Sequence, residues 1–125
     1  MRITASVLCA VVLLCVSVAA AAEEITAREK ERIEYLIGHV EAMNAEVFIR
    51  NGKEYGAGTA ARFLRSKWQA NTDTVKTAED FVEKIASRSS TTGAPYRIRL
   101  KDGTEIGCGD YLSRLLAAQR VPNNP

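Results

Sequence analysis

Apolar positions along this chain follow two periods, one typical of helices and one typical of strands. The first helical stretch begins at a capping box, Thr26 to Glu29, and ends near Asn44. Its apolar stripe predicts one buried face, made of Ile33, Leu36, Ile37, Val40 and Met43. Similar stripes predict three more helices, over about 59–70, from Thr77 to about 88, and after a cap at Asp110.

In the second predicted helix, the buried stripe and the outward face are separated clearly. The stripe consists of Ala57, Ala60, Ala61, Leu64 and Trp68. Its small residues allow close backbone packing, and Trp68 shares the stripe, so we expect it in the core. The outward face consists of Arg62, Arg65, Ser66 and Lys67.

Two alternating runs between the helices predict β-hairpins. Residues 47–50 lead into Asn51-Gly52, and this dipeptide favours a type I′ turn because both central residues need positive φ. Residues 96–101 lead into Asp102-Gly103, after which 104–106 return. The class is therefore α+β, with short antiparallel strands covered by helices.

The second hairpin repeats the first after 51 residues, turn over turn and exit glycine over exit glycine. This predicts two helix–β-hairpin–helix units, about 25–71 and 76–120, packed as a pseudo-symmetric pair. Such a pair would place a groove between the hairpins. The alternative is that two unrelated hairpins converged on the same turn chemistry.

The first 22 residues are predicted to be a cleaved signal peptide. Arg2 precedes an apolar run, and small residues lead to a cleavage point between Ala22 and Glu23. The remaining chain, 23–125, is long enough for one domain with a modest core. We therefore expect a periplasmic or secreted protein, with no stable membrane anchor after cleavage.

The net charge and the cysteine content limit the kinds of partner that we expect. The whole chain carries 17 basic and 15 acidic residues, a net charge of +2, and near-neutrality together with export argues against nucleic acid. Cys108 is the one cysteine after the leader, and it is either a buried thiol or the link of a dimer. The sequence leaves a monomer and a Cys108-linked dimer open.

The usual catalytic patterns are missing from the sequence. A metal site needs three or four clustered ligands, yet His39 is the single histidine and Cys108 the single mature cysteine. There is no nucleophile elbow, no S-x-x-K motif and no phosphate-cradling glycine loop. We expect no cofactor and no metal. His39 borders the first stripe and is interpreted as structural rather than as a partner of a Cys108 nucleophile.

Hydroxyl side chains between Ser87 and Thr92, with Tyr96 and Arg97 beyond, are the strongest candidates for binding a glycan or peptide. The alternative is that they satisfy backbone groups where the third helix ends. Arg50, beside the first turn, is either solvated, available for recognition, or paired with a carboxylate such as Asp80 or Glu54.

Three segments resemble a known family: FIRNGKEYGAGTAARFL at 48–64, TAEDFVEKIASRSSTTGAPYRIR at 77–99 and YLSRLL at 111–116. They are similar to the YfeK-like family, small exported proteins of Gram-negative bacteria classed as a domain of unknown function. The resemblance implies a periplasmic address and no established activity. Its characteristic residues fall here on Phe48, Ile49, Arg50, Asn51, Gly52, Tyr55, Ser87, Ser89, Ser90, Gly93, Pro95 and Tyr96.

Residues and resemblance together predict a non-enzymatic binding or interaction module of the cell envelope, recognising an envelope protein or polymer. The candidate binding residues are Arg50, Asn51, Tyr55, Ser87, Ser89, Ser90, Tyr96 and Arg97. One alternative is an inhibitor or immunity-type protein for an envelope enzyme. Another is a small hydrolase or transferase that uses Ser89 or Ser90 with a partner such as Asp80.

Overall fold

The computed structural model describes residues 24–120, so the predicted leader and its cleavage point at Ala22 and Glu23 lie outside the described residues. No helix within residues 24–120 is long and apolar enough to cross a bilayer. The elements in chain order are α1 (Ala27–Glu41), β1 (Val47–Arg50), β2 (Lys53–Tyr55), α2 (Ala57–Gln69), α3 (Ala78–Asp80), η1 (Phe81–Ala86), β3 (Arg97–Arg99), β4 (Glu105–Gly107) and α4 (Cys108–Arg120).

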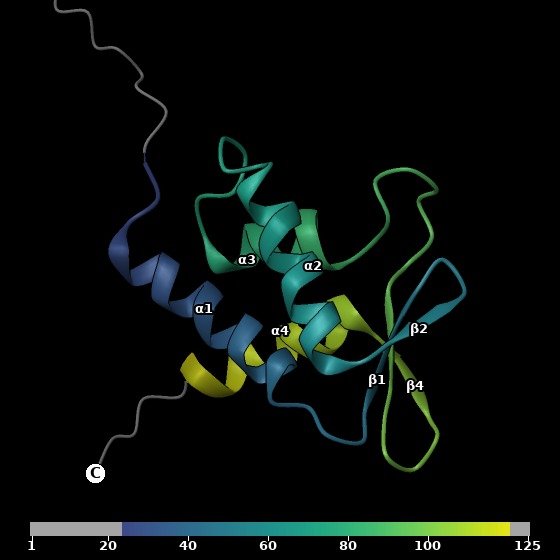
Figure 1. Cartoon of the computed structure of the whole chain (residues 1–125). Helices are drawn as coiled ribbons and strands as arrows, with labels where there is room; N and C mark the ends of the chain where they lie inside the picture. Colours follow the sequence, from purple (N-terminus) through teal and green to yellow (C-terminus); the bar gives the residue numbers. More distant parts are fainter. Residues whose placement is uncertain (1–23, 121–125) are drawn as a thin grey trace, which may run out of the picture.

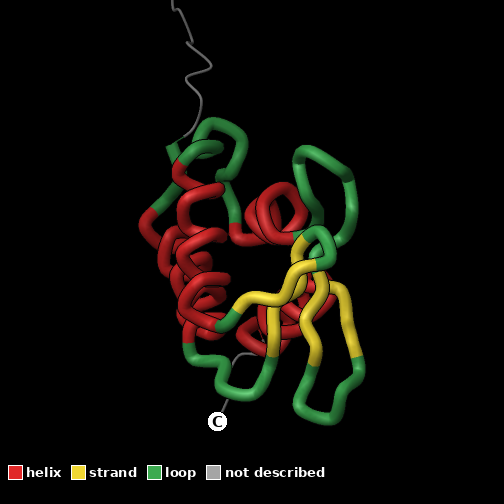
Figure 2. Tube along the Cα trace, turned by 45° about the vertical axis from the view of Figure 1, so that its right-hand side comes forward, coloured by secondary structure: helices red, strands yellow, loops and turns green. Residues whose placement is uncertain are grey.

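The predicted α+β class is confirmed. The four strands form one antiparallel sheet in the order β2-β1-β3-β4, so the two hairpins lie side by side. Figures 1 and 2 show the helices gathered on one side of this sheet. Phe48 pairs with Ile98, which in turn pairs with Ile106. This row faces the helices, because Phe48 and Ile98 are buried.

The helices form the core as their apolar stripes predict. The side chains of Ile33, Leu36, Ile37 and Val40 on α1 are fully buried, and the small side chains of Ala60 and Ala61 on α2 are buried with them. Trp68 packs edge-on against Phe81, at 6.1 Å between ring centroids, and is confirmed as a core residue. The hydroxyl of Thr26 caps α1 by accepting from the amide of Glu29 at 3.2 Å.

The two hairpins turn differently. Asn51 and Gly52 have φ of 49° and 78°, which gives the predicted two-residue turn of type I′. In the second hairpin, the amide of Leu100 donates to the carbonyl of Thr104 at 2.8 Å, and Gly103 has φ of 89°. The loop therefore has three residues, 101–103: Asp102-Gly103 lies in the turn as predicted, but Lys101 belongs to the loop and not to the strand.

This extra residue also shifts the side-chain alternation of the second hairpin. The 51-residue alignment places Phe48 over Arg99, yet Phe48 faces the core while Arg99 lies on the other face of the sheet. The hairpins share a sheet, but the predicted pseudo-symmetry is not confirmed.

The third predicted helix has a different winding from the one expected. Its first turn, α3, is capped by Thr77, and the chain then continues as the π-helix η1. The i→i+5 bonds of a π-helix widen each turn, which brings residues four and five apart onto one face. In this way Phe81, Val82, Ile85 and Ala86 are all buried. From the sequence alone, a stripe of this kind predicts an α-helix.

Two helix starts also differ from the prediction. Helix α2 begins at Ala57, with Gly56 as its N-cap, rather than at Thr59. Helix α4 begins at Cys108, so Asp110 lies in its first turn instead of capping it. Glycine at 109 allows this start: a Cβ there would collide with the hydroxyl of Ser87, so α4 packs directly against the end of η1.

Candidate functional site

Two neighbouring hollows lie between the first hairpin, α2 and the segment that leads to β3. We call them together the Arg50–Phe63 groove, and each one a half of it, because Arg50 and Phe63 line both. The aromatic half has a volume of about 330 Å³ and is lined by Phe48, Arg50, Tyr55, Thr59, Ala60, Arg62, Phe63 and Ser66. The hydroxyl half has a volume of about 190 Å³ and is lined by Arg50, Phe63, Lys67, Ser89, Ser90, Thr91 and Tyr96.

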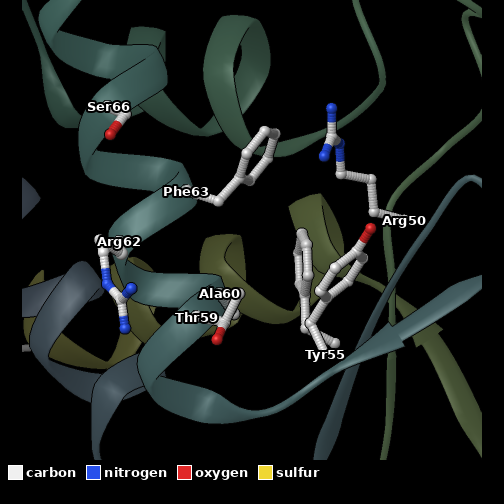
Figure 3. A pocket seen from close by; sticks show the side chains of 8 residues that line it. Arg50, Tyr55, Thr59, Ala60, Arg62, Phe63 and Ser66 are labelled. Atoms are coloured by element: carbon white, nitrogen blue, oxygen red, sulfur yellow. The ribbon is translucent and has the colours of Figure 1, made fainter.

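Strand alternation and one helical residue build the floor of the groove. Phe48 and Arg50 lie two residues apart on β1, so both face α2, and Tyr55 joins them because it pairs with Phe48. Phe63 reaches this face from α2 (Figure 3). Its ring lies 6.1 Å from that of Phe48 and, edge-on, 5.6 Å from that of Tyr96. These contacts fix the aromatic surface in place.

Arg50 lies against that surface. Its guanidinium carbon is 4.2 Å from the ring centroid of Phe63, which is cation–π distance. Figure 3 shows the guanidinium beside this ring. Its Nε is buried and has no hydrogen-bond partner among the described residues. A buried donor without a partner costs free energy, and because this Nε is enclosed, a ligand in the groove meets the rest of the guanidinium.

A second cation lies in the hydroxyl half. Lys67 Nζ donates to the carbonyl of Arg88 at 2.9 Å and to the hydroxyl of Tyr96 at 3.0 Å. Burial, and secondly the nearby charge of Arg50, lowers the pKa of Lys67. Burial raises the pKa of Tyr96, which keeps its hydroxyl protonated. Of the described residues, those lining the groove include no aspartate, glutamate or histidine. The groove is therefore positive and not neutralised by its own walls.

The predicted carboxylate partners of Arg50 are occupied elsewhere. Glu54 lies on the opposite face of the sheet and pairs with Arg99, at 3.0 Å between Oε2 and Nη1. Asp80 accepts from the amide of Lys76 at 2.9 Å and lies 3.9 Å from Lys84 Nζ. The alternative in which Arg50 pairs with Asp80 or Glu54 is wrong.

The serine-rich segment supports the groove through its own hydrogen bonds. Ser89 is 3% exposed, and its hydroxyl accepts from the amides of Thr91 and Thr92, each at 3.2 Å. Asn51 connects the first turn to this segment: its Oδ1 accepts from Thr92 Oγ1 at 2.7 Å, and its Nδ2 lies 3.5 Å from Ser89 Oγ. This is the backbone-satisfying role that serine and threonine take after a helix ends. Ser90 is exposed and lines the groove.

The candidates from the sequence thus divide into three groups. Five of them line the groove, namely Arg50, Tyr55, Ser89, Ser90 and Tyr96, and Asn51 supports it. Ser87 donates to the carbonyl of Val82 at 2.6 Å and lines a separate hollow with Gly109 and Asp110. Arg97 pairs with Ile49 and Gly107 and is exposed on the outer face. Ser87 and Arg97 therefore do not share the groove with Arg50, because each lies on another surface.

Sequence reasoning missed Phe63 and misplaced Lys67. Phe63 is an aromatic residue outside the buried stripe of its helix, and Lys67 follows one turn later. This i, i+4 pair was the available signal. Lys67 is not on an outward face as predicted; it is half-buried in the groove. The expected groove between the two hairpins is replaced by one between the first hairpin and α2.

Groups capable of nucleophilic or acid–base chemistry lie away from the groove or are engaged. His39 shares a hydrogen bond of 3.0 Å with the hydroxyl of Tyr111, where α1 meets α4. Cys108 is a buried free thiol, and burial raises its pKa to about 12. Both hold structural positions. Residues 24–120 contain no group of three or more His, Cys, Asp or Glu side chains able to hold a metal ion. The groove offers positive charge, aromatic surface and hydroxyls, a combination suited to binding.

Comparison with known proteins gives two matches. The model of a family of unknown function, DUF5329, matches residues 27–120. The uncharacterized protein YfeK of Salmonella typhimurium is 36% identical over 90 residues, which cover 72% of this chain and 74% of that protein. No solved structure matches the chain.

Proposed function

We propose that this chain, which belongs to DUF5329, a family of unknown function, is a non-enzymatic binding module of the cell envelope. After export it recognises an envelope protein or polymer by an anionic group that enters the Arg50–Phe63 groove. One observation carries this proposal. Arg50, held over the ring of Phe63, and Lys67 line the same small hollow, and no carboxylate lines it among the described residues.

The electrostatics favour an anion as the ligand. Two cations, Arg50 and Lys67, share a partly desolvated groove whose described walls carry no carboxylate. An anion that enters relieves the repulsion between the two cations. Its attraction to them is strong because little water is present in the groove to screen the charges. A charge-assisted hydrogen bond contributes about 1.5–3 kcal/mol. One such bond from each of Arg50 and Lys67 gives about 3–6 kcal/mol, to which contacts with the aromatic half add.

The absence of reactive groups supports binding rather than catalysis. Ser89, the serine of the enzyme alternative, accepts from two loop amides, and its suggested partner Asp80 is bound to Lys76 and Lys84. A nucleophile needs a base within hydrogen-bond reach. Among the described groove residues there is no histidine or carboxylate, and Lys67 directs its Nζ to the carbonyl of Arg88 and the hydroxyl of Tyr96 rather than to a serine.

Site-specific photo-crosslinking in living cells tests this proposal. A photoreactive residue replaces Ser66, which is exposed on the rim of the aromatic half, or Lys101, which is exposed in the second hairpin loop. We expect a discrete cross-linked product from position 66 and not from 101. The product should be lost with Arg50→Glu and kept with Arg97→Glu, a matched change on the outer face of the same sheet.

Two results would contradict the proposal. One is a product from position 66 that survives Arg50→Glu. The other is a product that depends equally on Arg97. If the cross-linked product contains one dominant enzyme in near-equal amount with this protein, the binding module is an inhibitor or immunity-type protein.

A further inference from the structure

The two halves of the groove differ in chemistry and meet at Arg50 and Phe63. The aromatic half is walled by the rings of Phe48, Tyr55 and Phe63, and its volume of about 330 Å³ admits an apolar side chain. The hydroxyl half, of about 190 Å³, holds Arg50 and Lys67 and admits a group of the size of a carboxylate. A ligand that fills both must carry an anion directly beside an apolar group.

We infer that the ligand is the free C-terminus of a polypeptide whose last side chain is apolar. In such a residue one Cα joins the carboxylate to the side chain, so both lie within a few ångströms of each other. The carboxylate then accepts from Arg50 and Lys67, while the side chain packs on Phe63. This inference rests on the proposed function and names its ligand class.

The donor set favours a carboxylate over a more highly charged group. A guanidinium edge matches the two coplanar oxygens of a carboxylate. Two of the donors of Lys67 are already directed to the carbonyl of Arg88 and the hydroxyl of Tyr96, which leaves few for a dianion. An internal Asp or Glu side chain also brings a carboxylate, but no apolar group on the adjoining atom. A uronate, as found in acidic polysaccharides, likewise lacks the apolar branch.

Fluorescence anisotropy with two peptide pools tests the inference. Both pools are randomised at upstream positions and end in Leu, Val or Phe; one has a free C-terminal carboxylate and the other a C-terminal amide. We expect the free-acid pool to bind at least about 10-fold more tightly, since a charge-assisted hydrogen bond is lost in the amide. Arg50→Gln should reduce the free acid to the level of the amide, and Arg97→Gln should leave it unchanged.

Failure of this inference is distinguishable from failure of the proposed function. Equal binding of the two pools, or no binding of either, would overturn the C-terminus as ligand. If the cellular cross-link still depended on Arg50, the binding module would stand with another ligand. Binding of a polyuronate in place of the free-acid pool would assign the groove to a polymer and also overturn the inference. Loss of Arg50 dependence in both experiments would overturn both.

Discussion

Arg50 on β1 and Arg99 on β3 lie on opposite faces of one small sheet and have different partners. On the outer face, Arg99 Nη1 lies 3.0 Å from Glu54 and Nη2 lies 3.4 Å from Glu105, so its charge is balanced by neighbouring strands. The hydrogen bond with Glu54 is the main cause that raises the pKa of Arg99. On the groove face, Arg50 contacts the ring of Phe63 and has no such carboxylate among the described residues.

This difference separates structural charge from charge available to a ligand. Both arginines occur in short strands with similar flanking residues, and sequence pattern alone treats them alike. The outer face is an alternation of opposite charges, typical of a solvated sheet surface. The groove face combines like charges with aromatic rings, and no carboxylate of its own walls balances them among the described residues. The predictions below test that contrast from the largest expected effect to the smallest.

Removal of the ring beneath Arg50 should weaken ligand binding most. Phe63→Ala takes away the cation–π surface and part of the aromatic wall, and we expect affinity for the free-acid peptides to fall about 10- to 100-fold. Phe63→Leu is the control for packing, because it keeps apolar volume without a ring face. Titrations of both variants, with urea unfolding alongside, separate affinity from stability. Unchanged affinity in a folded Phe63→Ala variant would contradict the role of the ring.

Loss of the Ser89 hydroxyl should destabilise the fold rather than remove an activity. Ser89→Ala removes the acceptor of the part-buried amides of Thr91 and Thr92, and at about 0.5–1.5 kcal/mol for each hydrogen bond we expect the free energy of unfolding to fall by about 1–3 kcal/mol. Ser90→Ala, at the exposed neighbouring position, should change it by less than about 0.5 kcal/mol. Chemical denaturation measures both. Equal stability of the two variants would show that Ser89 does not support this segment.

Ligand affinity should fall at alkaline pH through Lys67. Its pKa is lowered by burial and by Arg50, so it loses its charge at a lower pH than an ordinary lysine. Affinity is then full below that pKa and decreases as pH rises through it. The pKa of Tyr96 is raised, so its hydroxyl loses its proton only at a higher pH than an ordinary tyrosine. Isothermal titration calorimetry from pH 7 to 10 checks this. Lys67→Gln should bind more weakly at every pH, without the alkaline decrease, and an identical decrease in that variant would exclude Lys67 as its source.

A change at the balanced arginine should have the smallest effect. Arg99→Gln removes two exposed ion pairs, which contribute little to stability in water. We expect a slight decrease in the midpoint of thermal unfolding and the same affinity for the free-acid peptides. A loss of affinity comparable to that of Arg50→Gln would show that the two faces do not differ in the way described.

The sequence predicted much of the frame, because local rules decide it. Helical stripes located the four helical segments, and Asn51-Gly52 specified its turn through positive φ. The length of the second turn was not predictable, because Asp102-Gly103 suits both a two-residue turn and the last two positions of a three-residue loop. The π-helix was not predicted, because buried residues four and five apart also fit an α-helical stripe.

The site was only partly predictable, because it depends on tertiary placement. Alternation along β1 fixes that Phe48 and Arg50 share a face, but it does not show which helix covers that face. Ser87 and Ser89 lie two residues apart in the sequence, yet they line different hollows after η1 ends. Phe63 was overlooked since one aromatic residue outside a stripe carries little information until its partner is known.

The most direct test of the account is to observe the side chain of Arg50 itself. Its Nε–H group gives its own signal in a ¹⁵N–¹H spectrum, assigned by comparison with Arg50→Gln. On titration with the free-acid peptide pool, we predict a saturable shift of the Arg50 signal, with the signals of Arg97 and Arg99 unmoved and little response to the amide pool. Saturation of binding with the Arg50 signal unmoved would contradict the central claim that the ligand anion is held at Arg50.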